Sequence, residues 1–277
     1  MVQVKAQVLV HKKIAQDHFL MRLKSPPIAR RALPGQFVHV RCDETDYPLL
    51  RRPFSLLDTD QEKGTIDFIY KVVGLGTQVL AQISTGDRVD ILGPLGRPFD
   101  TQKNLRTVYL VGGGVGIPPL YLLAKSLVKN NPWTSMAAFL GARTRDWVIC
   151  VSQFRQLGIP VEVATDDGTF GFRGSVVELL QKFLESNRKD SHNDASGEEI
   201  LYICGPTPMM AAAAKLARQK RFPAQVSLEE RMGCAMGCCM GCVVEIATEP
   251  ANSHKRFQRV CTEGPVFPAE AVVWSGQ

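Results

Sequence analysis

The sequence predicts an antiparallel β-barrel over residues 1–100, a doubly wound parallel α/β sheet over residues 101–222, and a small cysteine-rich lobe over residues 223–277. Three observations predict this order. Short alternating strands separated by Pro and Gly turns fill the first hundred residues. Strands and helices then alternate, as they do in parallel sheets. Five of the eight cysteines fall in the last part.

Composition sets limits on function. The chain has 277 residues, of which 45% are hydrophobic and 22% are charged, as in a soluble globular protein. Its net charge of +6 comes from scattered residues without a long basic run, so we expect no nucleic-acid partner. We find no run of 18 apolar residues and no signal peptide, so we expect a cytoplasmic protein without a membrane span. Thiols stay reduced there, and clustered cysteines bind metal more often than they form disulfides.

The barrel part carries a short arginine motif. Alternation predicts strands over Val2–Val10, Gln36–Val40 and Thr65–Val72. Before the third strand stands the run Arg52, Pro53, Phe54 and Ser55. The forked guanidinium of the first residue can reach a pyrophosphate, the aromatic ring offers a stacking face, and the serine hydroxyl can hydrogen-bond to a flavin near its redox-active nitrogen. Alone the motif is weak, because an arginine before a strand is usually a solvated charge.

A second motif follows about twenty residues downstream. The strand ending Ile69, Tyr70 and Lys71 leads into a glycine loop with Gly76 and Thr77, after which Thr77–Ile83 is expected to be helical. A glycine loop before a helix can bind phosphate, although an ordinary turn with a Thr cap explains it as well. Together, the two motifs favour bound FAD.

The middle part carries a nucleotide motif. A strand at Thr107–Val111 runs into Gly112, Gly113, Gly114 and Gly116, and a helix is expected at Leu120–Val128. Strand, glycines and helix in that order form the context of a dinucleotide site. The run Cys204, Gly205 and Pro206 ends another strand of the same predicted sheet, at the edge where ligands bind in open α/β folds. The residues Asp166-Asp167-Gly168 form either an ordinary turn without a role in binding or a turn that lines the cofactor site. Spacing does not decide between NAD and NADP.

The cysteines of the last part have a recognisable spacing. Cys234, Cys239 and Cys242 form C-x4-C-x2-C, and Cys261 follows at a distance. This is the plant-type ferredoxin pattern, which holds a [2Fe–2S] cluster. Structural zinc is the alternative, and disulfides are a weaker one. Met-Gly-Cys triplets recur every four residues and place Cys238, rather than Cys239, in register with the other two. The spacing nevertheless favours Cys239.

Taken together, the motifs resemble the ferredoxin–NADP reductase superfamily, and within it the electron-transfer subunits of class 1B dihydroorotate dehydrogenases. Four runs carry the resemblance, which spans nearly the whole chain: GGGVGIPPL from Gly112, TDDGTFGFRG over Thr165–Gly174, E-R-M-x-C from Glu230, and CTEGPVF over Cys261–Phe267. Two features depart from the family pattern. Cys238 stands where a small residue is common, and the gap between Cys242 and Cys261 is somewhat long.

The resemblance implies an oxidoreductase subunit in pyrimidine (UMP) biosynthesis. FAD would be held by residues 52–55, 69–71, 76 and 77, the cluster by the four cysteines, and the nicotinamide cofactor would be NAD. The implied partner is an FMN-containing dihydroorotate dehydrogenase catalytic subunit, in a heterotetramer of two of each. Electrons would pass from dihydroorotate through that FMN, the cluster and FAD to NAD⁺.

Two other functions remain open from the sequence. A sulfide dehydrogenase- or transhydrogenase-type complex would use the same layout with another partner. A function of a different class is a protein-interaction module, in which the cysteines would bind a structural zinc ion and the nucleotide-binding fold would bind no cofactor. No residues suggest a dihydroorotate site or a catalytic acid or base on this chain, so activity on that substrate would need the partner.

Overall fold

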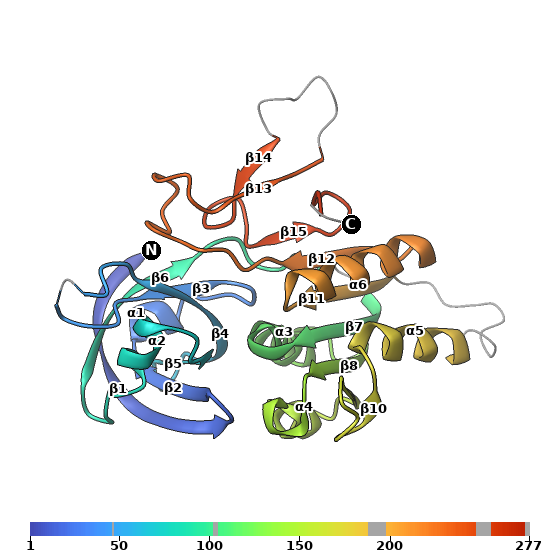
Figure 1. Ribbon diagram of the computed structural model, residues 1–277, viewed down its shortest axis with the longest axis horizontal. Helices are drawn as coiled ribbons and strands as arrows, with labels where there is room; N and C mark the ends of the chain where they lie inside the picture. The colour runs from blue at the N-terminus through green and yellow to red at the C-terminus, as the bar shows by residue number, and fades with distance from the viewer. Residues whose placement is uncertain (46, 102–104, 188–197, 248–255, 275–277) are drawn as a thin grey trace. The chain divides into compact units, whose positions relative to one another are not determined.

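The computed structural model describes residues 1–45, 47–101, 105–187, 198–247 and 256–274, and it comprises two compact units (Figure 1). The barrel unit combines residues 1–99 with residues 228–266. The sheet unit combines residues 100–227 with the chain from 267 onward.

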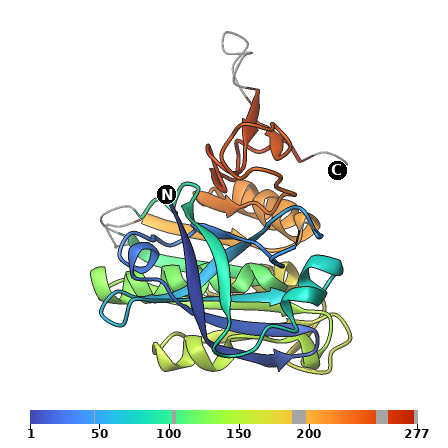
Figure 2. The same cartoon turned by 90° about the vertical axis from the view of Figure 1, so that its left-hand side faces the viewer.

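A closed barrel of six strands forms the first unit, in the order β1-β2-β5-β4-β3-β6. Each paired neighbour is antiparallel, and the long strands β1 and β6 run side by side in Figure 2. The bounds are β1 Val2–Ala15, β2 His18–Lys24, β3 Phe37–Val40, β4 Arg52–Asp60, β5 Thr65–Lys71 and β6 Arg88–Leu95, with short helices α1 Pro26–Ala29 and α2 Leu75–Leu80.

Strand β5 explains why this barrel is well packed. It lies between β2 and β4, and six of its seven residues are buried. Asp67 is 5% exposed, and the Nε and Nη2 atoms of Arg22 on β2 donate to its two carboxylate oxygens at 2.8 and 2.7 Å. A buried carboxylate is costly unless it is paired in this way. The alternating pattern of the sequence thus forms a strand that is covered on both faces.

Residues 228–266 form a cysteine segment that is attached to the barrel by backbone contacts. The amide of Arg97, just after β6, donates to the carbonyl of Gly264 at 2.6 Å. Within the segment, the amide of Leu228 donates to the carbonyl of Pro265 at 2.9 Å, and Pro265 also forms a β-bridge with Arg97. A small antiparallel hairpin, β13 Val243–Glu245 and β14 Phe257–Arg259, supports the cysteines. Both ends of the segment are therefore fixed beside the last barrel strand.

The second unit is built on a sheet of seven strands in the order β10-β9-β8-β7-β11-β12-β15. Pairings from β10 to β12 are parallel. The bounds are β7 Leu105–Gly113, β8 Ser135–Ala142, β9 Val161–Thr165, β10 Phe172–Arg173, β11 Glu198–Cys204, β12 Ala224–Ser227 and β15 Val266–Pro268. The predicted fold class, a barrel followed by a parallel sheet, is confirmed.

Helices cover both faces of this sheet (Figure 1). They are α3 Ile117–Asn130, α4 Val151–Gln156, α5 Val176–Asn187 and α6 Thr207–Lys220. The chain moves outward from β7 to β8 and β9, then returns to place β11 on the other side of β7. The carboxyl ends of β7 and β11 therefore flank the switch point where open α/β sheets bind ligands. Among the described residues, the helices lack the length and apolar character required to cross a membrane.

One predicted helix is shorter than expected. The sequence pattern indicates a helix over Trp147–Leu157, but α4 begins at Val151, after a short 3₁₀ turn over Arg145–Trp147. Cys150 separates the two with a left-handed φ of 66°, a conformation that L-residues adopt only locally and that interrupts a right-handed helix.

Gly116 offers a test of the β7–α3 turn. A Cβ at this position would lie 2.4 Å from the backbone of Cys204 and Gly205, which cannot move aside. We expect Gly116→Ala to destabilise the sheet unit by about 2 kcal/mol. The matched control, Gly114→Ala, meets no atom within 4 Å and costs only the left-handed φ of 52°, about 1 kcal/mol. Thermal unfolding measures both, and equal melting temperatures would contradict the interlocked turn.

Candidate cofactor sites

Arg52 and the glycine loop, about twenty residues apart in sequence, are brought together at the surface of the barrel. Arg52 begins β4, and a Cβ on Gly76 would lie 2.9 Å from the guanidinium Nε. The Arg52 side chain thus lies directly against the first turn of α2. In the described part of the chain no ion pair joins this guanidinium to a carboxylate, although its Nη1 donates to the carbonyl of Leu50. Arg52 therefore offers a positive charge that a bound anion can meet.

Thr77 closes the loop from within. Its hydroxyl donates to the carbonyl of Gly74 at 2.8 Å and accepts hydrogen bonds from the amides of Val73 at 2.9 Å and Gly74 at 3.2 Å. The side chain is 6% exposed. The Thr77 hydroxyl thus stabilises the shape of the loop. A ligand at this loop would contact mainly its backbone.

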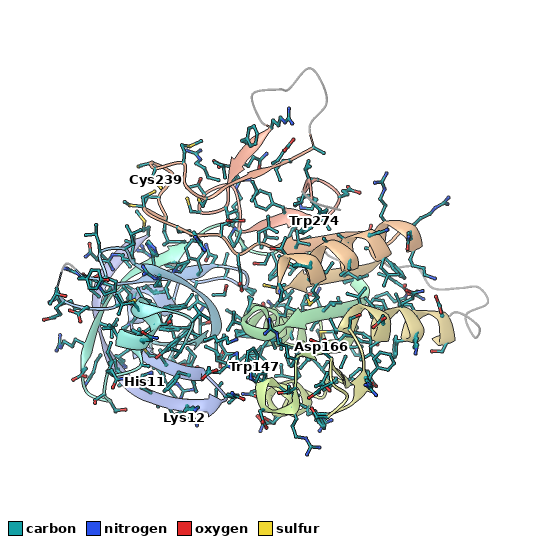
Figure 3. All side chains as sticks on the ribbon, in the orientation of Figure 1. His11, Lys12, Trp147, Asp166, Cys239 and Trp274 are labelled. Atoms are coloured by element: carbon teal, nitrogen blue, oxygen red, sulfur yellow. The ribbon has the colours of Figure 1, made fainter. Side chains whose placement is uncertain are left out.

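The side chain of Tyr70 points into the barrel. Its hydroxyl lies 2.8 Å from Nε2 of His11, whose Nδ1 lies 2.7 Å from the carbonyl of Ile83 (His11 is labelled in Figure 3). The Phe54 ring stacks on Phe68 with centroids 5.1 Å apart and lies 5.4 Å from the Tyr70 ring. Burial raises the pKa of Tyr70 beyond its usual range. The hydroxyl of Tyr70 is therefore engaged inside the barrel rather than presented to a ligand.

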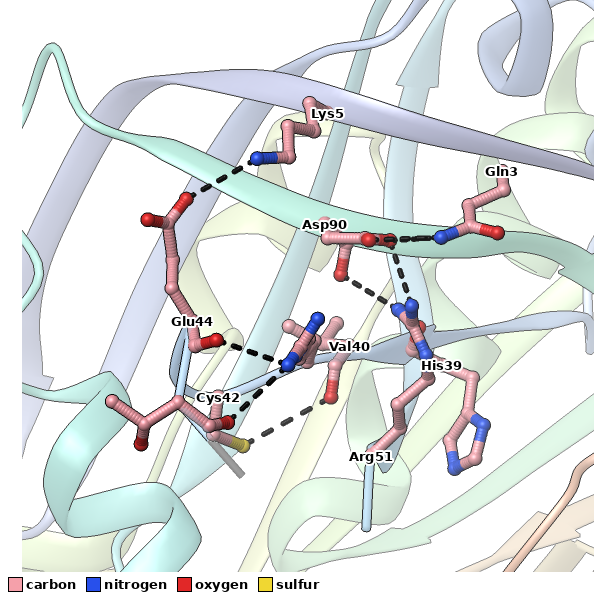
Figure 4. A network of polar contacts seen from close by, with 10 residues as sticks. Gln3, Lys5, His39, Val40, Cys42, Glu44, Arg51 and Asp90 are labelled. Atoms are coloured by element: carbon pink, nitrogen blue, oxygen red, sulfur yellow. Dashed lines mark hydrogen bonds and ion pairs between the residues drawn. The ribbon is translucent and has the colours of Figure 1, made fainter. Parts of the chain in front are cut away.

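A polar network fixes the residue before Arg52 (Figure 4). Nη2 of Arg51 forms an ion pair with the Asp90 carboxylate at 2.9 Å. Nη1 of Arg51 donates to the backbone carbonyl of Asp90 at 3.0 Å. Gln3 donates to the second oxygen of the same carboxylate at 2.8 Å. Arg51 is thereby tied to β6, and it sets the start of β4 from which Arg52 projects. Beside this network a cavity of about 650 Å³ lies among Cys42–Glu44, the end of α2 and the start of β6.

His39 is a buried residue that sequence patterns do not single out. It sits on β3 opposite Pro53 of the arginine motif, and it is 1% exposed. Neither ring nitrogen has a hydrogen-bond partner among the described residues. Burial, then the charge of Arg51, lowers the pKa of His39 to about 4, while the nearby backbone of Arg51 and Met232 acts weakly in the opposite direction. A neutral imidazole therefore lies between the arginine motif and the chain entering the cysteines.

In the sheet unit, two glycine turns interlock at the switch point. Gly112, at the end of β7, pairs with Cys204 at the end of β11. A Cβ on Gly113 would lie 3.1 Å from Pro206, and one on Gly205 would lie 3.0 Å from the backbone of Gly113. The residues predicted for the nucleotide, from Gly112 to Gly116 and from Cys204 to Pro206, thus form one surface. The first turns of α3 and α6 follow it directly, and free amides at helix starts bind phosphate.

Aromatic and charged residues lie at the ends of the neighbouring strands. Arg143 follows β8 and stacks over the Trp147 ring at 5.5 Å. The amides of Asp166 and Asp167, after β9, donate to the carbonyls of Ala142 and Arg143 (Asp166 and Trp147 are labelled in Figure 3). Asp167 is committed to its own turn, because its carboxylate accepts from the amide and hydroxyl of Thr169. The Asp166-Asp167 turn is therefore partly structural.

The four predicted ligand cysteines lie as two neighbouring pairs. The amide of Cys239 donates to Sγ of Cys234 at 3.4 Å. Cys242 and Cys261 are both buried, and the Cys242 side chain lies close enough to raise the pKa of Cys261. Within the described residues, no three or more metal-ligating side chains surround a single ion position. A [2Fe–2S] cluster takes two ligands on each of two irons, so two pairs match its needs.

The geometry separates Cys239 from Cys238. A Cβ on Gly233 or on Gly241 would lie 3.4 or 3.5 Å from Sγ of Cys239. This sulfur therefore sits over the residues directly before Cys234 and Cys242 (Cys239 is labelled in Figure 3). Cys238 and Cys239 are both exposed, so exposure does not distinguish them. The contact of the Cys239 sulfur with Gly233 and Gly241 supports the spacing argument over the triplet register.

Backbone amides surround the first pair. Burial alone would raise the pKa of Cys234, but the amides of Cys239 and Met236, with smaller contributions from Cys239 Sγ and the Cys238 amide, lower it to about 6. Burial, together with the Cys242 side chain, raises the pKa of Cys261 to about 12. Thiolate is the form that binds iron, so the lowered pKa of Cys234 favours ligation, whereas Cys261 would become a thiolate when metal binds.

The buried His39 predicts a pH dependence of stability. Its pKa of about 4 lies below the unfolded value of 6.5, so between these values the unfolded chain binds more protons and acid favours unfolding. From pH 7.5 to 5 we expect the barrel unit to lose about 2 kcal/mol more in the wild type than in His39→Leu. Urea unfolding at both pH values measures this difference. Equal losses in the two proteins would contradict a neutral buried imidazole.

Three family models match the chain in sequence order. An oxidoreductase FAD-binding domain matches residues 5–99, and an oxidoreductase NAD-binding domain matches residues 110–215. The iron-sulfur cluster binding domain of dihydroorotate dehydrogenase B matches residues 229–273. The FAD- and NAD-binding models and the cluster-binding model thus confirm the predicted cofactor set of FAD, a nicotinamide nucleotide and an iron–sulfur cluster.

Similar proteins and structures agree. The electron transfer subunit of dihydroorotate dehydrogenase B (NAD(+)) from Desulforamulus reducens is 42% identical, with 97% of each chain covered. Its counterpart from Shouchella clausii is 38% identical, with 98% of each chain covered. A structure of the NADH-dependent reduced ferredoxin-NADP oxidoreductase, described as giving insight into flavin-based electron bifurcation, aligns with a TM-score of 0.83 and 33% identity over 98% of this chain and 90% of its own.

A more distant structure shares the fold alone. The ferredoxin reductase in carbazole 1,9a-dioxygenase aligns with a TM-score of 0.66 and 20% identity over 80% of this chain and 67% of its own. The level of identity to the Desulforamulus and Shouchella proteins, over nearly the full length, is decisive. The chain belongs to the family of electron transfer subunits of dihydroorotate dehydrogenase B (NAD(+)).

Proposed function

We propose that this chain carries electrons between an FMN-containing dihydroorotate dehydrogenase catalytic subunit and NAD⁺, in pyrimidine (UMP) biosynthesis. The assignment rests on one observation above all: the arginine motif and the cysteine segment belong to one compact unit. A flavin and a cluster held in the same unit keep a fixed separation, which one-electron transfer between them requires. When bound, FAD supplies the exchange between two-electron and one-electron chemistry.

The residues divide into three sets, on domains proposed to span residues 1–100, 101–222 and 223–277. Arg52 would bind the FAD pyrophosphate, with Phe54 and Ser55 beside the flavin and the backbone of residues 69–71 and 76–77 around it. The glycine turns at Gly112–Gly116 and Cys204–Pro206 would bind the nicotinamide nucleotide, which we propose to be NAD. Cys234, Cys239, Cys242 and Cys261 would ligate the cluster.

The cysteine set fits an iron–sulfur cluster by its chemistry. Thiolates are the preferred ligands, and amides directed at their sulfurs stabilise the negative charge. The amides of Met236 and Cys239 both point at Sγ of Cys234 at 3.4 Å. We place the protein in the cytoplasm, where these thiols stay reduced.

The partner completes the activity. No residues of this chain are proposed to oxidise dihydroorotate, so the purified subunit should not do so until the catalytic subunit is added, and we propose an assembly of two of each. Dihydroorotate-dependent NAD⁺ reduction, assayed with and without that subunit, tests the proposal. Robust oxidation by this chain alone would refute it.

A second candidate function rests on the 33% identity to the NADH-dependent reduced ferredoxin-NADP oxidoreductase structure. A transhydrogenase-type or sulfide dehydrogenase-type complex would use the same cofactors with a different partner. Affinity capture of the chain from its native cells discriminates: the proposed function requires an FMN-binding barrel protein as the main partner.

The cysteine assignment predicts a contrast between adjacent residues. Cys239→Ser should lose the cluster, because this sulfur lies over Gly233 and Gly241 among the other ligands. Cys238→Ser, the matched control, should keep it. Iron and acid-labile sulfide counts with visible spectra of anaerobically purified proteins measure the outcome. The reverse result would assign Cys238 as the ligand.

Arg52 predicts the strength of flavin binding. Arg52→Gln removes a charge-assisted bond to phosphate, worth about 1.5–3 kcal/mol, so FAD affinity should fall about ten- to a hundredfold. Arg31→Gln, which removes an exposed arginine of the same unit, should leave it unchanged. Flavin fluorescence on titrating FAD into the flavin-free proteins measures both. Unchanged affinity in Arg52→Gln would place the pyrophosphate elsewhere.

A further inference from the structure

Arg259 connects the two halves of the cysteine segment. It ends β14, two residues before Cys261, and its Nη1 donates to the carbonyl of Gly237 at 2.9 Å. Gly237 lies between Cys234 and Cys239. A single side chain thus links the loop that carries the first cysteine pair to the hairpin that leads to the second.

The guanidinium is held rigidly for this contact. Its Nε donates to Glu263 at 2.9 Å, its Nη2 pairs with the other carboxylate oxygen at 2.5 Å, and the Arg259 amide donates to the same side chain at 2.8 Å. Arg259 lowers the pKa of Glu263 to about 2. A planar fork held by a carboxylate on one side presents the remaining nitrogen in a fixed direction.

Gly237 has the close packing that such a contact requires. Its φ is +86°, and a Cβ would lie 2.9 Å from the Thr262 methyl carbon and 3.2 Å from Nη1 of Arg259. Only glycine combines this dihedral with this approach at low cost. The Gly237 carbonyl is therefore directed at Arg259 by the shape of the loop as well as by the hydrogen bond.

The held carbonyl lies in the stretch of loop that donates amides to sulfur. In a trans peptide the N–H of the next residue points opposite to the carbonyl, so the hydrogen bond from Arg259 fixes the plane of the peptide between Gly237 and Cys238. The amides on either side of this peptide, those of Met236 and Cys239, both donate to Sγ of Cys234 at 3.4 Å. The contact with Arg259 therefore lies between the two amides that reach the Cys234 sulfur.

We propose that Arg259 is a positioning residue for the cluster: by holding the Gly237 carbonyl it fixes the stretch of loop from Met236 to Cys239, whose two end amides donate to the sulfur of Cys234. The inference rests on the proposed function, since it assumes a cluster on these cysteines. Amide hydrogen bonds to sulfur stabilise the reduced, more negative cluster and so raise its reduction potential.

Arg259→Gln should therefore shift the cluster midpoint potential to a more negative value. When both proteins are held at the wild-type midpoint potential, the ratio of reduced to oxidised cluster is one in the wild type. In the variant, this ratio should be several-fold lower. Its EPR signal on reduction should change in g-values, since the ligand environment changes. FAD content should stay at the wild-type level, because the barrel is not involved. Redox titration followed by EPR and visible absorption measures all three.

Two further variants decide between explanations. Arg256→Gln is the matched control, because Arg256 forms an ion pair with Glu245 in the same hairpin. It should keep the wild-type potential, and an equal shift in it would overturn the proposal. Arg259→Lys keeps the positive charge but cannot hold Glu263 and the Gly237 carbonyl in one planar fork. We expect it to shift in the same direction as Arg259→Gln.

Each outcome is interpretable. A wild-type potential in Arg259→Lys beside a shifted Arg259→Gln would assign the effect to charge alone and overturn the positioning role. Loss of the cluster from both Arg259 variants, with FAD retained and Arg256→Gln normal, supports it. Unchanged potential and EPR in Arg259→Gln would refute it, whereas a wild-type protein without a [2Fe–2S] signal would refute the proposed function instead.

Discussion

The backbone hydrogen bond from Arg97 to Gly264 is the contact on which the arrangement of the barrel unit depends. In its described residues, the cysteine segment contains little regular structure besides a short hairpin and turns. A segment of that kind cannot bury enough apolar surface to hold a defined shape by itself. Attached at Gly264 and Pro265, three and four residues after Cys261, it takes its position from the last strand of the barrel.

This attachment gives the chain a division of labour. The barrel supplies rigidity through a closed set of strands and through the ion pair between Arg22 and the buried carboxylate of Asp67. The cysteine loop supplies thiols and backbone amides. The switch point of the parallel sheet supplies glycine turns that bring backbone close to backbone. Under the proposed function, each cofactor would meet the group best suited to it: a guanidinium for phosphate, glycine turns for a nucleotide, and thiolates for iron.

Much of this organisation could be predicted from the sequence, because its signals are local. The alternating strands, the glycines after β7 and the cysteine spacing are each readable within a dozen residues. What could not be predicted depends on contacts between distant segments. The imidazole of His39 faces the chain near Met232, and Arg259 reaches back to Gly237. One local feature also escaped prediction: the left-handed φ of Cys150 delays the start of α4 to Val151. The position of the Cys239 sulfur, which supports the proposed ligand choice, likewise depends on the fold of the loop.

The inward orientation of Tyr70 has a consequence for how this family can diverge. Because its ring packs with Phe54 and its hydroxyl meets His11, selection on residue 70 acts through the interior of the barrel. Residues 11 and 70 should therefore change together among relatives. Sequence variation at residue 70 then reflects packing inside the barrel, and it is a poor guide to cofactor preference.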